Sequence, residues 1–377
     1  MSASTATATA PGLSRLPWPA IAPLAAWLVF LLTFWLEGPV ATTLVAVALV
    51  CVVLAAVHHA EVVAHRVGEP FGTLVLAVSV TVIEVSLIVA LMFSAGEAAP
   101  GLARDTVFAA VMLILTGMVG LSLLAGAVLH GEQAFEQRGV SAALATLAAL
   151  SVLTLVLPNF TISVPGPYYS AGQLAFVAAV SLVLYGAFVL VQNFRHRDYF
   201  LAPDADAEAD AGSGAAGDEA HAPRPSNRVA IRSVLLLLAS LGAVVLLAED
   251  LEPAAEAALE RLNAPKAAVG VFIALLVLLP EGLAAFRAAR ANRLQTSLNL
   301  ALGSALASIG LTIPTVAIIS LANGWTLALG LDDKSTVLLG LSLLVTTLSL
   351  GTGRTTVLQG TVHLVICAVY LFTTIVP

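Results

Sequence analysis

The stretch "LVLAVSVTVIEVSLIVALM", residues 74–92, decides the fold class of this chain. Its nineteen residues are about as many as an α-helix needs to cross a lipid bilayer. Glu84 is its only charged residue, and the run shows no alternation of apolar and polar residues of the outer-membrane barrel kind. The stretch therefore predicts a membrane-spanning α-helix that carries one acid at depth.

The composition of the whole chain extends this prediction. Of 377 residues, 59% are hydrophobic and 10% are charged, against roughly 25% charged residues in soluble domains. We therefore expect an all-α membrane protein whose surroundings are membrane lipid. The formal net charge of −7 argues against nucleic acid as a partner. The sequence leaves open whether the protein forms a homo-oligomer.

Apolar runs separated by short polar segments predict about eleven transmembrane helices. Their expected limits are 18–36, 40–58, 71–94, 105–130, 140–157, 172–193, 229–248, 266–288, 296–322, 335–351 and 355–376.

One long hydrophilic segment, residues 194–228, separates the first six helices from the last five. Its middle, "PDADAEADAGSGAAGDEAHAPRP", has too few large apolar residues to fold alone. We expect an N-terminal part at 1–58 that includes the start of a first repeat, a five-helix repeat at 40–193, an acidic linker at 194–228, and a second five-helix repeat at 229–377.

The positions of lysine and arginine predict the orientation in the membrane. With the N-terminus inside, twelve of the sixteen basic residues lie on the inner side, as the positive-inside rule requires. We therefore expect a multi-pass protein of the cell membrane, the inner or plasma membrane, with its N-terminus and the 194–228 segment in the cytoplasm.

A weak internal repeat flanks the linker. "AEVVAHRVGEPFG" starts at Ala60 and leads to Glu84, and "AEAALERLNAPKAAVG" starts at Ala255 and leads to Glu281. Five helices per copy would place the two copies in opposite orientations. Inverted repeats with a binding site at their interface near the bilayer midplane are a common plan of transporters.

Glu84 and Glu281 are the candidate cation- and proton-binding residues, and the candidate metal ligands. Glu281 lies deep in "VFIALLVLLPEGLAAF", residues 271–286, where an unpaired charge costs roughly 2.5–3.5 kcal/mol on insertion scales. One interpretation is a protonated carboxyl hydrogen-bonded between helices. The other is a site where a proton and a hard cation displace each other, because burial favours the neutral acid and carboxylates bind hard cations.

Other polar residues could complete such a site. Pro280 predicts either a broken helix with free carbonyl oxygens or a passive kink. The small-residue face of the 296–322 helix either packs closely or supplies oxygen ligands. The supporting candidates are Ser79, Thr81 and Ser86 near Glu84, and Ser304, Asn299 and Ser308 near Glu281.

Motifs of the common enzyme classes are missing from the sequence. It holds no P-loop, no glycine-rich dinucleotide turn, no serine nucleophile elbow and no HExxH zinc pattern. We expect a protein that is not an enzyme and that uses no cofactor, with inorganic cations and protons as its cargo.

Three segments carry a family resemblance: "GEPFGTLVLAVSVTVIEVSLIVALM" from Gly68, "LLPEGLAAFRAARANRLQTSLNLALGSALASIGLTIP" from Leu278, and "GTGRTTVLQGTVHLVICAVYLF" from Gly351. The chain resembles the calcium/proton antiporters of the bacterial ChaA kind, within the cation/calcium exchanger superfamily. The resemblance implies one helix plus two inverted five-helix repeats, and exchange of a cytoplasmic cation for an external proton. Glu84 and Glu281 match the family's essential glutamates, and Ser304 matches the serine of its Gly-Ser segment.

The chain departs from the family pattern at three positions. Thr81 and Leu278 stand where the wider family has an asparagine three residues before each glutamate, and Ala307 replaces a glutamine. Fewer amide oxygens are therefore available to a cation. Ca²⁺ is the leading expected cargo, Na⁺/H⁺ or K⁺/H⁺ exchange is the alternative, and a passive cation channel is the alternative from another class.

Overall fold

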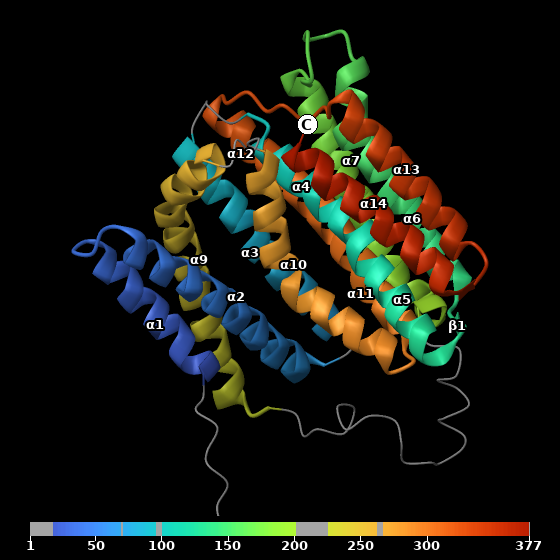
Figure 1. Ribbon diagram of the computed structural model, residues 1–377, viewed down its shortest axis with the longest axis horizontal. Coiled ribbons are helices and arrows are strands. Elements are labelled where there is room, and N and C mark those ends of the chain that lie inside the picture. The colour runs from blue at the N-terminus through green and yellow to red at the C-terminus, as the bar shows by residue number, and fades with distance from the viewer. Residues whose placement is uncertain (1–17, 69–70, 96–99, 201–224, 262–266, 377) are drawn as a thin grey trace, which may run out of the picture.

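The computed structural model describes residues 18–68, 71–95, 100–200, 225–261 and 267–376. In this part of the chain, eleven helical segments form a single bundle (Figure 1). The first six are α1 (Trp18–Thr33), α2 (Pro39–Val67), α3 (Phe71–Ala95), α4–η2–α5 (Leu102–Met112, Leu113–Met118, Val119–His130), α6–η3–η4 (Gln137–Ser151, Val152–Val156, Leu157–Phe160) and α7–η5 (Ala171–Leu190, Val191–Arg195). The last five are α9 (Asn227–Arg261), α10 (Ala267–Arg290), α11–η7–α12 (Leu294–Ala307, Ser308–Thr312, Ile313–Asn323), α13 (Asp333–Leu350) and α14 (Val357–Ile375).

The helices confirm the predicted all-α membrane class. Among the described residues, nine helices are long and apolar enough to cross a membrane, and two shorter apolar helices, Trp18–Thr33 and Val78–Phe93, complete the set. Two helices run further than predicted: α2 ends at Val67 instead of 58, and α9 at Arg261 instead of 248. The end of α9, residues 249–261, is rich in alanine, leucine and glutamate, which keep a chain helical beyond its apolar part. The end of α2, residues 59–67, carries Ala60, Glu61, Ala64 and Arg66, which are also good helix formers.

The predicted linker is only partly described by the structure. Residues 201–224 lie outside the described residues. Before them, η6 (Arg197–Phe200) forms a short 3-10 turn, and after them α9 begins at Asn227. The limits proposed for the linker and the two repeats stay a prediction.

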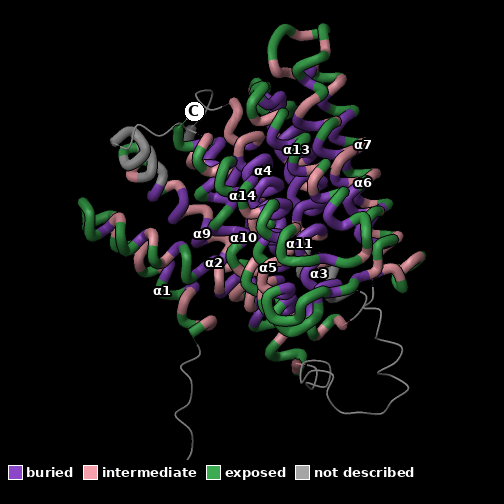
Figure 2. The backbone as a smooth tube through the Cα atoms, turned by 45° about the vertical axis from the view of Figure 1, so that its right-hand side comes forward, coloured by how far each residue is buried: buried purple, intermediate pink, exposed green. Residues whose placement is uncertain are grey.

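Both halves of the bundle contain a central helix interrupted by a π-helical turn, η2 in α4–η2–α5 and η7 in α11–η7–α12. Two further π-helical turns, η3 and η5, follow α6 and α7. In the most apolar stretch of the helices interrupted by η2 and η7, 83% and 67% of the residues are buried, against 44% or less in the other seven long helices. The interrupted helices therefore form the centre of the bundle, where Figure 2 shows much of the buried backbone.

The π turns η2 and η7 each pack against the last helix of the other half. A Cβ added at Gly117 in η2 would lie 3.3 Å from the Cys367 sulfur of α14. A Cβ added at Gly310 in η7 would lie 2.8 Å from the Cβ of Tyr185 in α7. The two halves are thus interlocked through matching contacts.

Two apolar cores meet along the helices that carry the glutamates. One core joins α1, α2 and α9 with one side of α3 and α10, and the other joins α4–α7 and α11–α14 with their opposite side. On α3, Ile83 and Leu87 belong to the first core and Ile88 to the second. Figure 1 shows α1, α2 and α9 together at one side of the bundle.

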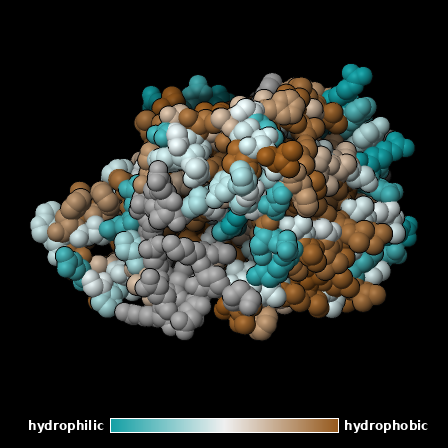
Figure 3. Space-filling view, turned by 90° about the horizontal axis from the view of Figure 1, so that it is seen from above, coloured by the Kyte–Doolittle hydropathy of each residue, from teal (hydrophilic) through white to brown (hydrophobic). Residues whose placement is uncertain are grey.

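The two ends of the bundle differ. The arginine-rich end, which carries Arg66, Arg138, Arg232 and Arg290, also holds a short antiparallel pair of strands, β1 (Gln133–Ala134) and β2 (Arg354–Thr355). At the opposite end, residues 324–332 connect α12 to α13. Figure 3 looks onto that opposite end, where hydrophilic and hydrophobic side chains are interspersed.

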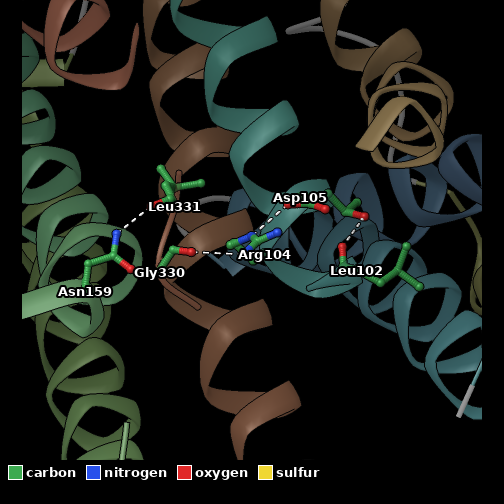
Figure 4. Close-up of polar contacts among 7 residues, drawn as sticks. Leu102, Arg104, Asp105, Asn159, Gly330 and Leu331 are labelled. Carbon is green, nitrogen blue, oxygen red and sulfur yellow. Dashed lines mark hydrogen bonds and ion pairs between the residues drawn. The ribbon is translucent and has the colours of Figure 1, made fainter. Parts of the chain in front are cut away.

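Hydrogen bonds fix the 324–332 connection to several helices. Arg104 bonds Asp105 and donates to the carbonyl of Gly330 at 3.0 Å, while Asn159 donates to the carbonyl of Leu331 (Figure 4). The backbone N–H of Leu331 also donates to the Leu155 carbonyl at 2.8 Å. This end of the bundle is therefore held together by polar contacts across both halves.

The crossing of α5 and α14 generates a test of this packing. A Cβ added at Gly360 would lie 2.5 Å from the backbone nitrogen of Leu124, so Gly360→Ala should cost about 1–3 kcal/mol of stability through overpacking. Thermal unfolding of the purified protein in detergent measures this loss. Gly340→Ala, where nothing lies within 4 Å of the added Cβ, is the matched control and should not lower the melting temperature. Equal melting temperatures for the two variants would contradict this crossing.

Candidate functional site

Glu84 lies in the middle of α3, at the boundary of the two apolar cores, and only 4% of its surface is exposed. The hydroxyl of Ser308, the first residue of the π turn η7, donates to Oε2 of Glu84 at 2.7 Å. The other carboxyl oxygen, Oε1, is buried and has no hydrogen-bond partner among the described residues. Glu84 thus has one fixed oxygen and one oxygen available to a proton or an ion.

Glu281 lies in α10, and its Oε2 is likewise buried without a hydrogen-bond partner in the described part of the chain. The charges of Glu84 and of Glu61, on α2, both act on the Glu281 carboxyl. The predicted pair is therefore brought together in space from the two halves of the sequence.

The packing of α10 places Glu281 next to the other π turn. A Cβ at Gly270 of α10 would lie 2.9 Å from the backbone of Asp105 in α4, and the two helices run in the same direction. Glu281 follows Gly270 by eleven residues, about three helical turns, so it points to the same side of α10. This register sets Glu281 level with Thr116 and Gly117 in η2.

Each glutamate therefore lies beside the π turn of the opposite half. Glu84 meets η7 through Ser308, and Glu281 lies level with η2. A π turn displaces the regular helical hydrogen bonds and often occurs at functional sites. Two carboxyls in range of each other's charge, each with an unpartnered oxygen, form a site that can take either protons or a cation.

The supporting residues on α3 occupy two different sides of the helix. Thr81 is buried and precedes Glu84 by three residues, so it lies on the same side. Ser79 and Ser86 are five residues before and two residues after Glu84, which turns both to the opposite side of a helix with 3.6 residues per turn. Of these three, the structure groups only Thr81 with Glu84.

The candidates on α11 are also divided. Ser304 precedes Ser308 by one turn and shares its side of the helix. Asn299 lies on another side, where its side chain donates to the Phe200 carbonyl at 2.6 Å and accepts from Gln295 at 3.0 Å. The amide of Asn299 is thus engaged near the arginine-rich end, away from the glutamate pair.

Pro280 does not break α10, which is helical from Ala267 to Arg290. Proline has no N–H, so the carbonyl of Leu276 lacks its usual helical donor. The helix is therefore not broken at Pro280, as the interpretation of a passive kink requires. The Leu276 carbonyl nevertheless lacks its regular helical partner.

The π turns, and the position in the first half that matches Ser308, could not be predicted from the sequence. Ser308 lies fourteen residues after the start of α11, and Thr116 lies fourteen residues after the start of α4. Thr116 is fully buried, and its hydroxyl donates to the Met112 carbonyl at 2.5 Å. Counting from the helix starts would have revealed this match, but the starts are hard to locate inside continuous apolar sequence.

Comparison with known proteins gives the same classification over nearly the whole chain. The sequence profile of the sodium/calcium exchanger protein family matches residues 38–194 and 232–376. The protein y4hA of Sinorhizobium fredii is 51% identical over 325 residues, which cover 86% of each chain. The sodium-potassium/proton antiporter ChaA of Escherichia coli is 38% identical over 317 residues, which cover 84% of each chain.

Solved structures share the fold at low sequence identity. The native structure of YfkE superposes with a TM-score of 0.69 at 16% identity, covering 96% of this chain and all of that one. The H⁺/Ca²⁺ exchanger CAX superposes with a TM-score of 0.66 at 14% identity, covering 94% of this chain and 93% of that one. The eleven-helix exchanger fold that the resemblance implied is confirmed. The chain belongs to the sodium/calcium exchanger protein family, whose members are transporters and not enzymes.

Proposed function

We propose that the protein is a secondary antiporter that exchanges a cytoplasmic cation for an external proton, with Glu84 and Glu281 as the shared binding residues. The observation that carries the proposal is the buried pair itself. Each carboxyl has an oxygen without a hydrogen-bond partner among the described residues, and the charge of one acts on the other. Membership of an exchanger family supports the same function.

Competition between proton and cation supplies the coupling. Two negative charges this close in an apolar region repel each other strongly, so the empty pair retains protons. A bound cation neutralises the carboxylates, so their mutual repulsion no longer favours the protonated forms. The site carries either protons or the cation at any one time. Transport of the cation in one direction is therefore followed by transport of protons in the other.

Ca²⁺ is the leading cargo in this proposal. Two carboxylates neutralise one divalent cation, and hydroxyl and carbonyl oxygens near the pair are further ligands of the kind that Ca²⁺ accepts. Ser308 and Ser304 on α11 and Thr81 on α3 are the nearest such groups by helix side. The structural neighbour CAX is an H⁺/Ca²⁺ exchanger.

Exchange of Na⁺ or K⁺ is the second candidate. The specific observation in its favour is the 38% identity to ChaA, a sodium-potassium/proton antiporter. The replacement of amide residues by Thr81, Leu278 and Ala307 also reduces the number of strong oxygen ligands, which matters more for a divalent than for a monovalent ion.

The proposed orientation puts the arginine-rich end in the cytoplasm. Arg66, Arg138, Arg232 and Arg290 lie at this end, and positively charged residues collect on the cytoplasmic side of membrane proteins. The connection at residues 324–332 would then face the outside.

The first prediction concerns the transported ion. In proteoliposomes with an imposed pH gradient, addition of Ca²⁺ should dissipate the gradient, and a panel with Na⁺ and K⁺ ranks the three cations. Cation-driven proton flux in sealed vesicles without any other ion gradient distinguishes exchange from a passive channel. If none of the three cations changes the internal pH, the antiporter proposal is wrong.

The second prediction concerns the glutamate pair. Glu84→Gln and Glu281→Gln should each abolish exchange, because a neutral amide can neither release a proton nor neutralise a cation. Glu37→Gln changes an exposed acid and is the control that should keep wild-type transport. Thermal unfolding in detergent checks that the variants are folded, and wild-type rates in either glutamate variant would remove that residue from the site.

The third prediction concerns Ser308. Hydrogen bonds to charged groups contribute about 1.5–3 kcal/mol, so Ser308→Ala should weaken the apparent affinity for the transported cation at least about tenfold. The same donor stabilises the ionised carboxylate, so its loss should move the pH of half-maximal transport upward. Ser240→Ala is the matched control, because the Ser240 hydroxyl is buried and bonds only the Leu236 carbonyl of its own helix in the described structure. An unchanged affinity and pH profile in Ser308→Ala would contradict the role of this contact.

A further inference from the structure

A row of buried polar atoms leads from Glu281 along the contact between α5 and α10, beyond the glutamate pair. Glu281 Oε2, Ser122 Oγ and Gln133 Oε1 are all buried and have no hydrogen-bond partner among the described residues. Ser122 is 1% exposed and Gln133 is 3% exposed. Buried polar atoms in proteins are almost always hydrogen-bonded, to protein or to ordered water.

The direction of Ser122 follows from its neighbours on α5. Gly117, Gly120 and Leu124 lie on the side of η2–α5 that touches α14, where Cβ atoms at Gly117 and Gly120 would meet Cys367 and His363. Ser122 is two residues from both Gly120 and Leu124, so it points away from α14.

The opposite side of α5 is the side that meets α10. Gly126, one turn after Ser122, has the Gln133 side chain packed directly against it, since an added Cβ would lie 1.7 Å from Gln133 Oε1. The Nε2 of Gln133 donates to the Ala289 carbonyl of α10 at 3.1 Å and to Asn292 Oδ1 at 2.9 Å. Ser122 therefore faces the contact with α10, one turn from Gln133.

The facing side of α10 begins at Glu281. Ala285 and Ala289 follow it at four and eight residues, and both are fully buried. The register set by Gly270 and Asp105 places Ser122 five to six residues beyond the level of Glu281, about 8 Å along the helix axis. Gln133 lies about 6 Å further, next to the exposed His130 and Asn292 at the arginine-rich end.

We propose that this row is the inner proton path of the antiporter, in which water molecules bonded to Ser122 and Gln133 connect the Glu281 carboxyl to the arginine-rich end. Hydrogen-bonded oxygens are spaced about 2.8 Å apart, so one or two waters fill each gap. A proton leaves the Glu281 carboxyl for the nearest water, the carboxylate remains to bind the cation, and a proton exits beyond Gln133.

The inference rests on the proposed antiport function, and the experiment separates the two. Proteoliposomes that contain the full-length protein are used for two measurements on each variant. The first is proton-coupled exchange, followed by the internal pH at saturating cation. The second is exchange of radiolabelled cation against the same unlabelled cation at equal pH on both sides, which requires no net proton movement.

Ser122→Ala should slow proton-coupled exchange at least about fivefold, as expected for loss of a hydrogen-bonding group on the path, and leave cation–cation exchange at the wild-type rate. The slowed reaction should also show a larger solvent deuterium isotope effect than the wild type. Ser151→Ala is the matched control, because Ser151 is equally buried and its hydroxyl also has no partner in the described structure, but it lies on α6. This control should leave both rates unchanged.

A second pair of variants guards against a folding defect. Ser122→Thr and Ser122→Val have the same shape and differ only in the hydroxyl, so the threonine variant should transport protons faster than the valine variant. Equal rates in this pair, or equal loss of both kinds of exchange in Ser122→Ala, would overturn the proton path. Wild-type proton coupling in Ser122→Ala would overturn it as well, while a wild-type protein without any cation/proton exchange would overturn the proposed function instead.

Discussion

The charge of Glu84 acts on Glu281 across the boundary between two apolar cores, and much of the bundle serves to hold these two acids together. A charge buried in an apolar region is costly unless it is neutralised or paired. The helices around the pair supply few charges, so neutralisation must come from protons or from an ion. The two glutamates come from different halves of the chain, on α3 and α10, so the contact between the halves sets the distance between them.

The π turns η2 and η7 are the structural means by which the halves meet this constraint. Each of these two interrupts the most buried helix of its half and packs against the last helix of the other half. At η7, the interruption coincides with Ser308, which fixes one oxygen of Glu84 and leaves the other available. At the matching position of the first half, the hydroxyl of Thr116 instead donates to the Met112 carbonyl of its own helix. Glu84 and Glu281 therefore have different hydrogen-bonding surroundings, although each lies near an interrupted central helix of the opposite half.

The sequence predicted the features that depend on composition and on local runs of residues. The lone acid in residues 74–92, the number of helices and the partnership of Glu84 with Glu281 all follow from apolar length, charge depth and the repeat. The sequence could not predict the features that depend on helix rotation over long distances. Ser79, Ser86 and Asn299 were close to the glutamates in the sequence or in the motif, but their positions on the helices turn them to other sides. The π turns escaped prediction because nothing in an all-apolar run marks where helical hydrogen bonds shift by one residue.

The surroundings of Glu281 differ on its α2 side and its α5 side. This difference bears on how the one carboxyl binds both a cation and a proton that move to or from the arginine-rich end. On α2, Glu61 acts electrically on Glu281, whereas Arg66, five residues later, lies on the opposite side of the helix and bonds Asn227 of α9. The α2 side of Glu281 therefore carries a negative charge, which favours a cation over an anion there. The proposed path at the contact with α5 runs along the Ser122 hydroxyl and the Gln133 amide, which are neutral groups that hold water for a proton but offer a bare cation no charge. If the cation and the proton reach the Glu281 carboxyl from different sides of α10, the proton can leave as the cation binds, which fits the competition at the shared site.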